Sequence, residues 1–168
     1  HKGDKILVGV NGCFGRGMRE IACSYGAKVI EVKARNGKAI TAEMVRTKVE
    51  KNRNIKAIML VYTETSTGII NPIKEIGRVA KEYDIPLIVD AVCSIGVEEF
   101  AMEKWNVSFS CTSSQKGLQA PPGLGIAAVS RRGWKAIEER EAPNHGWYSN
   151  LLNWKRATET NIVRRGII

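Results

Sequence analysis

The stretch of sequence that decides the fold class is residues 55–68, IKAIMLVYTETSTG, in which an apolar run leads directly into hydroxyl and carboxyl side chains. The run Ile55–Tyr62 is apolar nearly throughout, which is typical of a strand that is covered on both faces. Such strands belong to parallel sheets, in which a helix crosses over between one strand and the next. The stretch therefore predicts an α/β fold with a mostly parallel sheet.

The rest of the chain repeats this alternation of short β-branched runs and longer stretches of helical period. No internal repeat or linker interrupts it, so we expect a single three-layer α/β unit over residues 1–168, with helices flanking the sheet. The expected strands are Lys5–Val10, Lys28–Val32, Ile55–Tyr62, Leu87–Asp90, Ser108–Ser113 and Gly125–Ser130. The expected helices are Arg16–Tyr25, a helix capped by Thr41 that runs to Asn52, a helix opened by Pro72, Trp134–Arg140 and Tyr148–Arg156.

The composition excludes two classes of protein. A chain of 168 residues that is 43% hydrophobic can bury a sizeable core, which excludes disorder. Lysine and arginine number 26 against 17 acidic residues, for a formal net charge of +9. The basic residues are scattered and aromatic residues are only 7% of the chain, so the stacking surface of nucleic-acid binders is missing. We therefore expect a solvated basic surface and no nucleic-acid partner.

The apolar runs and the cysteines indicate a compartment. No run approaches the ~18–20 residues that a membrane-spanning helix needs, and no signal-peptide pattern begins the chain. Cys13, Cys23, Cys93 and Cys111 lack CxxC spacing, and we interpret them as free thiols in a reducing compartment. We therefore expect no membrane contact and a cytoplasmic location. With only two histidines in the chain, no metal site is expected either.

A glycine cluster over residues 9–17 follows the first expected strand and opens a helix, and Glu31 ends the next strand. This order imitates a dinucleotide-binding fingerprint. The spacing is imperfect, because counting from Gly12 fails at Phe14 and counting from Gly15 places Glu20 where a third glycine belongs. A nicotinamide-binding domain is therefore an alternative that is not favoured.

Polar residues follow three apolar strands at their carboxyl ends, where open α/β sheets bind ligands. They are residues 63–68, residues 90–92 and residues 113–116. Each alone has an ordinary explanation as a turn, a cap or a solvated loop. Together they offer one acid, one amine and several hydroxyls, which fit the needs of pyridoxal phosphate.

Four segments carry a resemblance to a known family. They are NGCFG at 11–15, ETSTG at 64–68, VDAVCS at 89–94 and SQKGLQAPPG at 114–123, of which the last is the most specific. In order and spacing they resemble the class V aminotransferases of fold type I. The sequence is most similar to the alanine–glyoxylate and serine–pyruvate aminotransferases, from Gly3 to about Trp154. The resemblance implies the large-domain fold of these pyridoxal 5'-phosphate enzymes.

The resemblance implies catalytic roles for two residues. Lys116 matches the lysine that holds the cofactor as a Schiff base and then moves a proton at the substrate α-carbon. Asp90 matches the acid that faces the pyridine nitrogen and keeps it protonated. Loss of either side chain should therefore remove the chemistry.

The resemblance also implies cofactor contacts. Phe14 falls where the family stacks an aromatic ring, commonly tryptophan, on the cofactor. Thr65 matches a hydroxyl near the phenolic oxygen, and Val92 matches an apolar contact on the ring face opposite Phe14. Gln115, together with Ser114, matches the stretch that approaches the phosphate. For Val92 and Ser114, simple packing is an equally good explanation.

The function that the resemblance implies is transfer of an amino group from alanine or serine to glyoxylate or pyruvate. The alternatives are another donor, such as an aminoalkyl phosphonate or aspartate, and a lyase or desulfurase on the same cofactor. A desulfurase is less favoured, because it needs a mobile cysteine and the four cysteines fall in expected strands and helices. A binding or scaffold role without cofactor is the last alternative.

The chain differs in length from the family that it resembles, whose members are more than twice as long. The loop that binds the cofactor phosphate should precede His1, and the small domain with the substrate-carboxylate arginine should follow Ile168. We therefore expect the central part of the large domain of a homodimer with its active site at the interface. Alone, this part should be inactive, and Thr160 and the tail 155–168 are assigned no role.

Overall fold

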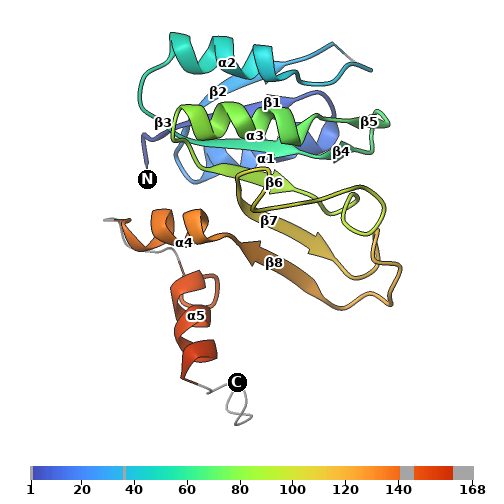
Figure 1. Ribbon diagram of the computed structural model, residues 1–168, viewed down its shortest axis with the longest axis vertical. Coiled ribbons are helices and arrows are strands. Elements are labelled where there is room, and N and C mark those ends of the chain that lie inside the picture. The colour runs from blue at the N-terminus through green and yellow to red at the C-terminus, as the bar shows by residue number, and fades with distance from the viewer. Residues whose placement is uncertain (1, 36, 141–145, 161–168) are drawn as a thin grey trace. The chain divides into compact units, whose positions relative to one another are not determined.

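A computed structural model of the chain describes residues 2–35, 37–140 and 146–160 (Figure 1). The chain divides into two compact units, His1–Trp134 and Lys135–Ile168. The first unit contains the sheet, and the second contains most of the two C-terminal helices. None of the described helices is long and apolar enough to cross a membrane.

The first unit is built on a six-stranded sheet with the order β2-β1-β3-β6-β7-β8. The pairs β1–β2, β1–β3, β3–β6 and β6–β7 are parallel, and only β8 runs antiparallel to its neighbour. This confirms the predicted mostly parallel sheet. The strands are β1 (Lys5–Val10), β2 (Lys28–Lys33), β3 (Ile55–Val61), β6 (Leu87–Asp90), β7 (Val107–Ser113) and β8 (Gly125–Val129), and a separate hairpin pairs β4 (Thr63–Glu64) with β5 (Ile69–Ile70).

Helices cover both faces of the sheet, which confirms the three layers (Figure 1). Because side chains alternate along a strand, neighbours in β1 enter different cores. Leu7 packs in the larger core with Val45 and Ile76, whereas Val8 packs on the opposite face with Ala22. The helices are α1 (Cys13–Ser24), α2 (Ala42–Lys51), α3 (Ile73–Glu82), α4 (Arg131–Glu138) and α5 (Leu151–Glu159).

The first residues of α2, α4 and α5 can be compared with the predicted helix starts. Thr41 caps α2 as predicted, since its hydroxyl accepts the amide of Met44 at 3.2 Å. Helix α4 begins at Arg131, three residues before its predicted start, because the Ser130 hydroxyl accepts the amide of Gly133. Helix α5 begins three residues later than predicted, where Asn150 caps it. Short-range caps therefore set these boundaries.

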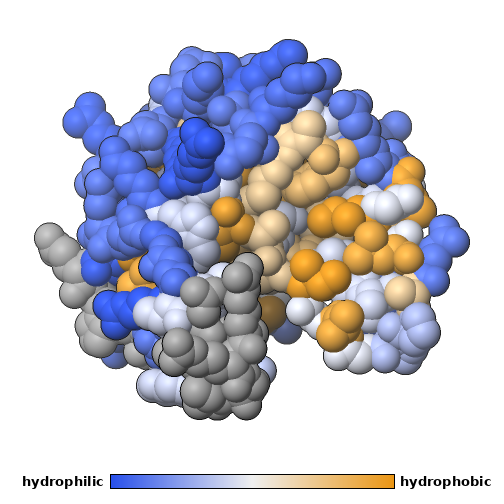
Figure 2. Space-filling view, turned by 60° about the horizontal axis from the view of Figure 1, so that its bottom comes forward, coloured by the Kyte–Doolittle hydropathy of each residue, from blue (hydrophilic) through white to orange (hydrophobic). Residues whose placement is uncertain are grey.

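Strand β8 forms one edge of the sheet, and no described strand pairs with its outer side. Its residues 125–128 are all exposed. Figure 2 shows that hydrophobic residues gather on one face of the molecule. Leu124 and Ile126 are among the exposed large hydrophobic side chains of the chain. The antiparallel end of the sheet is thus less covered than its centre.

The crossover from α3 to β6 and β7 depends on a close backbone contact at Gly77. A Cβ atom at this position would lie 1.8 Å from the carbonyl oxygen of Trp105. Trp105 is itself buried against Tyr62, with the rings edge to face at 6.1 Å. The helix can approach this turn only because position 77 has no side chain.

We expect Gly77→Ala to lower the free energy of unfolding by ~2 kcal/mol or more, because the backbone must move to admit the methyl group. This outcome opposes intrinsic propensity, in which alanine is the better helix former by about 1 kcal/mol. Gly17→Ala in α1 is the matched control, since a Cβ there meets no described atom within 4 Å, and it should stabilise. Urea denaturation measures both variants, and stabilisation by both would contradict the contact.

Candidate active site

The predicted site residues all lie at one edge of the sheet. Strands β1, β3, β6 and β7 are neighbours in parallel pairs, so their carboxyl ends meet there, with adjacent strands ~4.8 Å apart. Every predicted residue lies at one of these four ends or in the segment that directly follows it. Phe14 follows β1, Thr65 follows β3, Asp90 ends β6 and Val92 follows it, and Gln115 and Lys116 follow β7.

The first turn of α1 is bound by a carboxylate that the sequence analysis assigned no role. Gly15 N donates to Glu64 Oε2 at 2.9 Å, and Phe14 N donates to Glu64 Oε1 at 3.3 Å. Cys13 N donates to Ser66 Oγ at 2.8 Å, and Ser66 Oγ donates in turn to Glu64 Oε1 at 2.5 Å. These acceptors explain why α1 begins at Cys13 and not at Arg16, as the sequence predicted: a cap from ~50 residues away leaves no local signal.

The same hydrogen bonds remove the dinucleotide interpretation of the glycine cluster. A pyrophosphate at this turn would need the α1 amides that Glu64 and Ser66 already use. Glu31, the residue that would hold a ribose, instead pairs with Arg19 at 3.4 Å and Lys33 at 3.1 Å. The amides of this turn therefore bind side chains of the chain itself and not a phosphate.

Side-chain hydrogen bonds join the other loops of the edge to one another. Thr63 and Ser94 share a hydrogen bond between their hydroxyls at 2.7 Å, which links the loop after β3 to the turn after β6. Thr112 Oγ1 donates to Val92 O at 3.2 Å, which links that turn to β7. Val92 is half-buried, in keeping with a packing role.

Two buried asparagine side chains, Asn11 and Asn71, lie near the carboxyl ends of β1 and β3. Asn11 Nδ2 donates to Asn71 Oδ1 at 3.0 Å and to Lys38 O at 3.2 Å. Asn71 Nδ2 donates to Val61 O at 2.8 Å, and Asn71 Oδ1 accepts from Ile40 N at 2.8 Å. The pair ties together the ends of β1 and β3 and the loop before α2. Asn11 belongs to the quoted NGCFG segment, but no local pattern indicates its partner.

Two glycines bring the lysine loop against the turn after β6. A Cβ at Gly117 would lie 2.2 Å from Ile95 O, and a Cβ at Gly96 would lie 2.4 Å from Gly117 O. Gly96 also has φ of +98°, which side chains rarely adopt. Lys116, which precedes Gly117, is therefore held close to the turn that starts at Asp90.

The hydroxyl of Ser114 closes this lysine loop at its base. It donates to Pro121 O at 2.7 Å and accepts from Leu124 N at 3.3 Å. This supports the packing explanation for Ser114 over a phosphate contact. Gln115 and Lys116 are exposed, and no hydrogen bond or ion pair between described residues joins Lys116 to Asp90. The structure brings the two to one edge without direct contact.

Asp90 is the half-buried acid at the centre of this edge. One of its oxygens accepts from Val92 N at 3.0 Å, and the other accepts no hydrogen bond from the described residues. Burial raises the pKa of Asp90 above its ordinary value, and the negative charge of Glu64 raises it further. Asp90 thus offers a free carboxylate oxygen with increased affinity for a proton.

The cysteines differ from the sequence expectation at one position. Cys93 lies in the turn after β6 and not in a strand or helix, because Asp90 accepts the Val92 amide and bends the chain there. Cys13 and Cys23 are in α1 and Cys111 is in β7, in agreement with the expectation that these cysteines lie in strands or helices. All four are free thiols. No metal-binding cluster occurs among the described residues.

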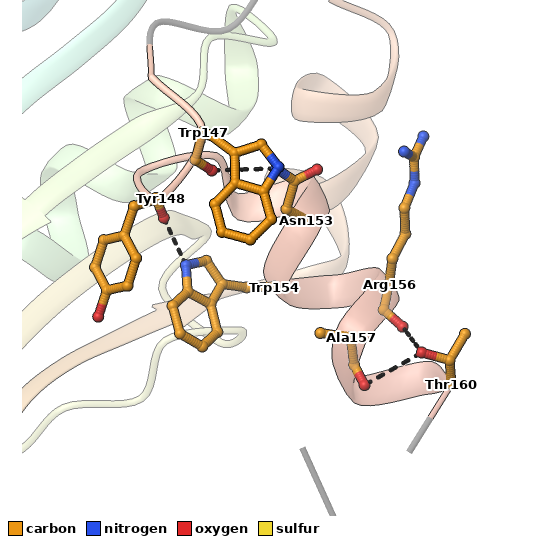
Figure 3. Close-up of a pocket in the computed structure, with 7 residues that line it drawn as sticks. All are labelled: Trp147, Tyr148, Asn153, Trp154, Arg156, Ala157 and Thr160. Atoms are coloured by element: carbon orange, nitrogen blue, oxygen red, sulfur yellow. Dashed lines mark hydrogen bonds between the residues drawn. The ribbon is translucent and has the colours of Figure 1, made fainter. Parts of the chain in front are cut away.

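The second unit contains a cavity of about 250 Å³ that the sequence analysis did not predict (Figure 3). Tyr148 and Trp154 meet edge to face at 5.3 Å, and Trp154 Nε1 donates to Tyr148 O at 2.7 Å. Thr160 lines the same cavity, and its hydroxyl donates to Arg156 O at 2.7 Å at the end of α5. The aromatic walls favour contact with apolar groups, and none of the predicted site residues lies here.

The chain is similar to known proteins over most of its length. The family described as aminotransferase class-V matches residues 1–142. An uncharacterized aminotransferase of Methanocaldococcus jannaschii is 39% identical over 158 residues, 94% of this chain and 41% of that protein. The alanine–glyoxylate aminotransferase of Drosophila melanogaster is 36% identical over 151 residues, 89% of this chain and 38% of that protein.

A solved structure matches a similar share of the chain. The crystal structure of an alanine–glyoxylate aminotransferase from Nostoc sp. has a TM-score of 0.88 at 31% sequence identity, and the match covers 94% of this chain and 41% of that one. The resemblance predicted from the four segments is therefore confirmed. The chain spans about two fifths of the length of these relatives.

We expect Asp90→Asn to stabilise the protein at neutral pH. Because the folded-state pKa is raised, the folded chain keeps the Asp90 proton to a higher pH than the unfolded chain, and ionisation of the carboxyl then costs stability. Asparagine can accept the Val92 amide without that charge. Its advantage should shrink as the pH falls toward 3.8, the ordinary value for this group. Urea unfolding of both proteins between neutral pH and about pH 4 measures this, and a pH-independent difference would refute it.

Proposed function

Because the chain belongs to the class-V aminotransferase family, we propose that it forms the cofactor site of a pyridoxal 5'-phosphate-dependent transaminase. The single observation that carries the proposal is the Asp90 carboxylate. It lies half-buried among four strand ends and keeps one oxygen without a described hydrogen-bond donor. The first turn of α1 supplies an aromatic ring, and the loop after β7 supplies a primary amine.

The residues present fit this cofactor. Phe14 is 50% exposed, so its aromatic ring is accessible for stacking. An ionised Asp90 could pair with a protonated pyridine nitrogen, and that positive charge would offset the burial that raises the pKa of Asp90. Thr65 is exposed beside the loop, where its hydroxyl can donate, and Gln115 is exposed beside Lys116. Val92 would supply the apolar contact.

The proposed division of work follows from these positions. When bound, the cofactor supplies an aldehyde and a conjugated ring that accepts electrons. Asp90 holds the proton at the ring nitrogen, and Phe14 orients the ring by contact with its face. Lys116 Nζ is the amine that binds the cofactor and then acts as the base at the substrate α-carbon. The close approach of Gly117 to Ile95 O fixes the backbone next to Lys116, from which that amine extends.

For the substrates we propose a small amino-acid donor, alanine or serine, and glyoxylate or pyruvate as acceptor. The names of the Drosophila and Nostoc proteins support alanine and glyoxylate. Relatives named for serine, aspartate and aminoethylphosphonate also match, so aspartate or an aminoalkyl phosphonate is the alternative donor. A homodimer with a shared active site completes the proposal, and the four free thiols support a cytoplasmic location.

We expect borohydride reduction of the gene product that carries this sequence, after addition of pyridoxal 5'-phosphate, to fix the cofactor on Lys116. The readouts are a visible absorbance band before reduction and the labelled peptide found by mass spectrometry. Lys116→Ala should lose both signals. Lys81→Ala is the matched control, because that exposed lysine lies in the last turn of α3, just before the amino end of β6, and it should keep them.

Absence of the band, or a label spread over surface lysines, would overturn the assignment. If the label is on Lys116, transfer of the amino group to glyoxylate from alanine, serine, aspartate and aminoethylphosphonate, measured in parallel, decides the donor. Activity with the phosphonate alone would replace the small amino-acid proposal by its alternative.

A further inference from the structure

A buried carboxylate at the candidate site takes no part in the chemistry proposed above. Glu64 is 0% exposed, and a buried charge is costly unless hydrogen bonds replace its hydration. Burial alone would raise the pKa of Glu64, but hydrogen bonds from Ser66, Gly15 and Phe14 outweigh it and lower the pKa below the ordinary value. Glu64 is therefore a charged acceptor, and its stabilising contribution is present at neutral pH and lost as the pH falls below that value.

The position of Glu64 joins two of the predicted cofactor contacts. Its carboxylate accepts the amide of Phe14, and its own backbone directly precedes Thr65. The backbone of Glu64 is fixed in turn by pairing with Ile69 in the β4–β5 hairpin. One side chain thus connects the loop after β1 with the loop after β3.

The neighbouring glycine is built around this carboxylate. A Cβ at Gly12 would lie 2.3 Å from both the carboxyl carbon and Cγ of Glu64, and 2.5 Å from Ser66 Oγ. Gly12 is extended, with φ of −175°, so the need for glycine here is the space and not the backbone angle. The Glu64 and Ser66 side chains therefore fill the space that a side chain at position 12 would need.

We propose that Glu64 is a positioning residue, which acts through Phe14 and Thr65 to hold the aromatic ring and the hydroxyl in one arrangement against the bound cofactor. The part of this inference that concerns the cofactor rests on the proposed function. The part that concerns the chain is independent of the proposed function, because Glu64 accepts the amides of Phe14 and Gly15 without any ligand. We call this pair of hydrogen bonds the clamp on α1. The two parts are separable by experiment.

The first test measures the clamp itself. Glu64→Gln keeps the size of the side chain but removes the charge and turns an amide group toward backbone amides that need an acceptor. We expect hydrogen exchange at Phe14 and Gly15 to become about tenfold faster or more, as loss of a charged acceptor implies. Glu20→Gln, an exposed acid on the same helix, is the matched control and should leave these amides unchanged.

The second test measures the effect on the cofactor. Glu64→Gln should weaken binding of pyridoxal 5'-phosphate about tenfold, and should alter the visible circular dichroism of the bound cofactor. In a Phe14→Leu background the same substitution should cost much less, because residues that act through one another are not additive. If Glu64→Gln fails to fold, Ser66→Ala removes one donor to the carboxylate at an exposed position and should show the same pattern more weakly.

The outcomes separate the two proposals. Full additivity of Glu64→Gln and Phe14→Leu, or unchanged exchange at Phe14 and Gly15, would overturn the positioning role. Failure of the unmodified protein to bind pyridoxal 5'-phosphate would overturn the proposed function. In that case fast exchange in Glu64→Gln would still support the clamp, and the cofactor part of the inference would fall with the function.

Discussion

The parallel pairing of β1, β3, β6 and β7 is the constraint on which the candidate site depends. Parallel strands end at the same edge of a sheet, so side chains far apart in the sequence arrive together without any direct bond. The register sets Val61 beside Asp90 and Asp90 beside Cys111. A slip of one residue would turn Asp90 toward the opposite face of the sheet. The hydrophobic cores on the two faces prevent that slip, because each takes alternate residues of the same strands.

Close backbone approach completes what the register begins. Gly12, Gly96 and Gly117 each stand where a Cβ would lie within 2.5 Å of a neighbouring atom. The first brings α1 to Glu64, and the other two bring the lysine loop to the turn after Asp90. The site is therefore assembled from backbone contacts and a few buried polar groups, while the side chains proposed to meet the cofactor are exposed or, for Asp90 and Val92, half-buried. Such a division leaves the reactive groups free and the supporting loops rigid.

The pKa values of the two carboxylates at this edge, Glu64 and Asp90, are shifted in opposite directions. Glu64 has donors that replace its hydration, so its pKa is lowered and its charge stabilises the first turn of α1. Asp90 is half-buried with one donor and faces the Glu64 charge, so its pKa is raised and its ionisation works against the folded state. An acid that costs stability and keeps a free oxygen is the pattern expected of a group kept for binding or catalysis.

The sequence by itself determined the fold class, the order of the sheet-forming segments and the family, because period, β-branched runs and four short motifs are local properties. It also predicted that Asp90, Lys116 and Phe14 lie at or just after the carboxyl ends of strands, which is where the structure has them. Only the tertiary structure decided the start of α1, the clamp by Glu64 and the amide pair of Asn11 and Asn71, since each partner lies far away in the sequence. It likewise showed that Ser114 closes its own loop and that the first amides of α1 already donate to Glu64 and Ser66. Hydrogen-bond partners across strands depend on register and packing, which no local pattern records.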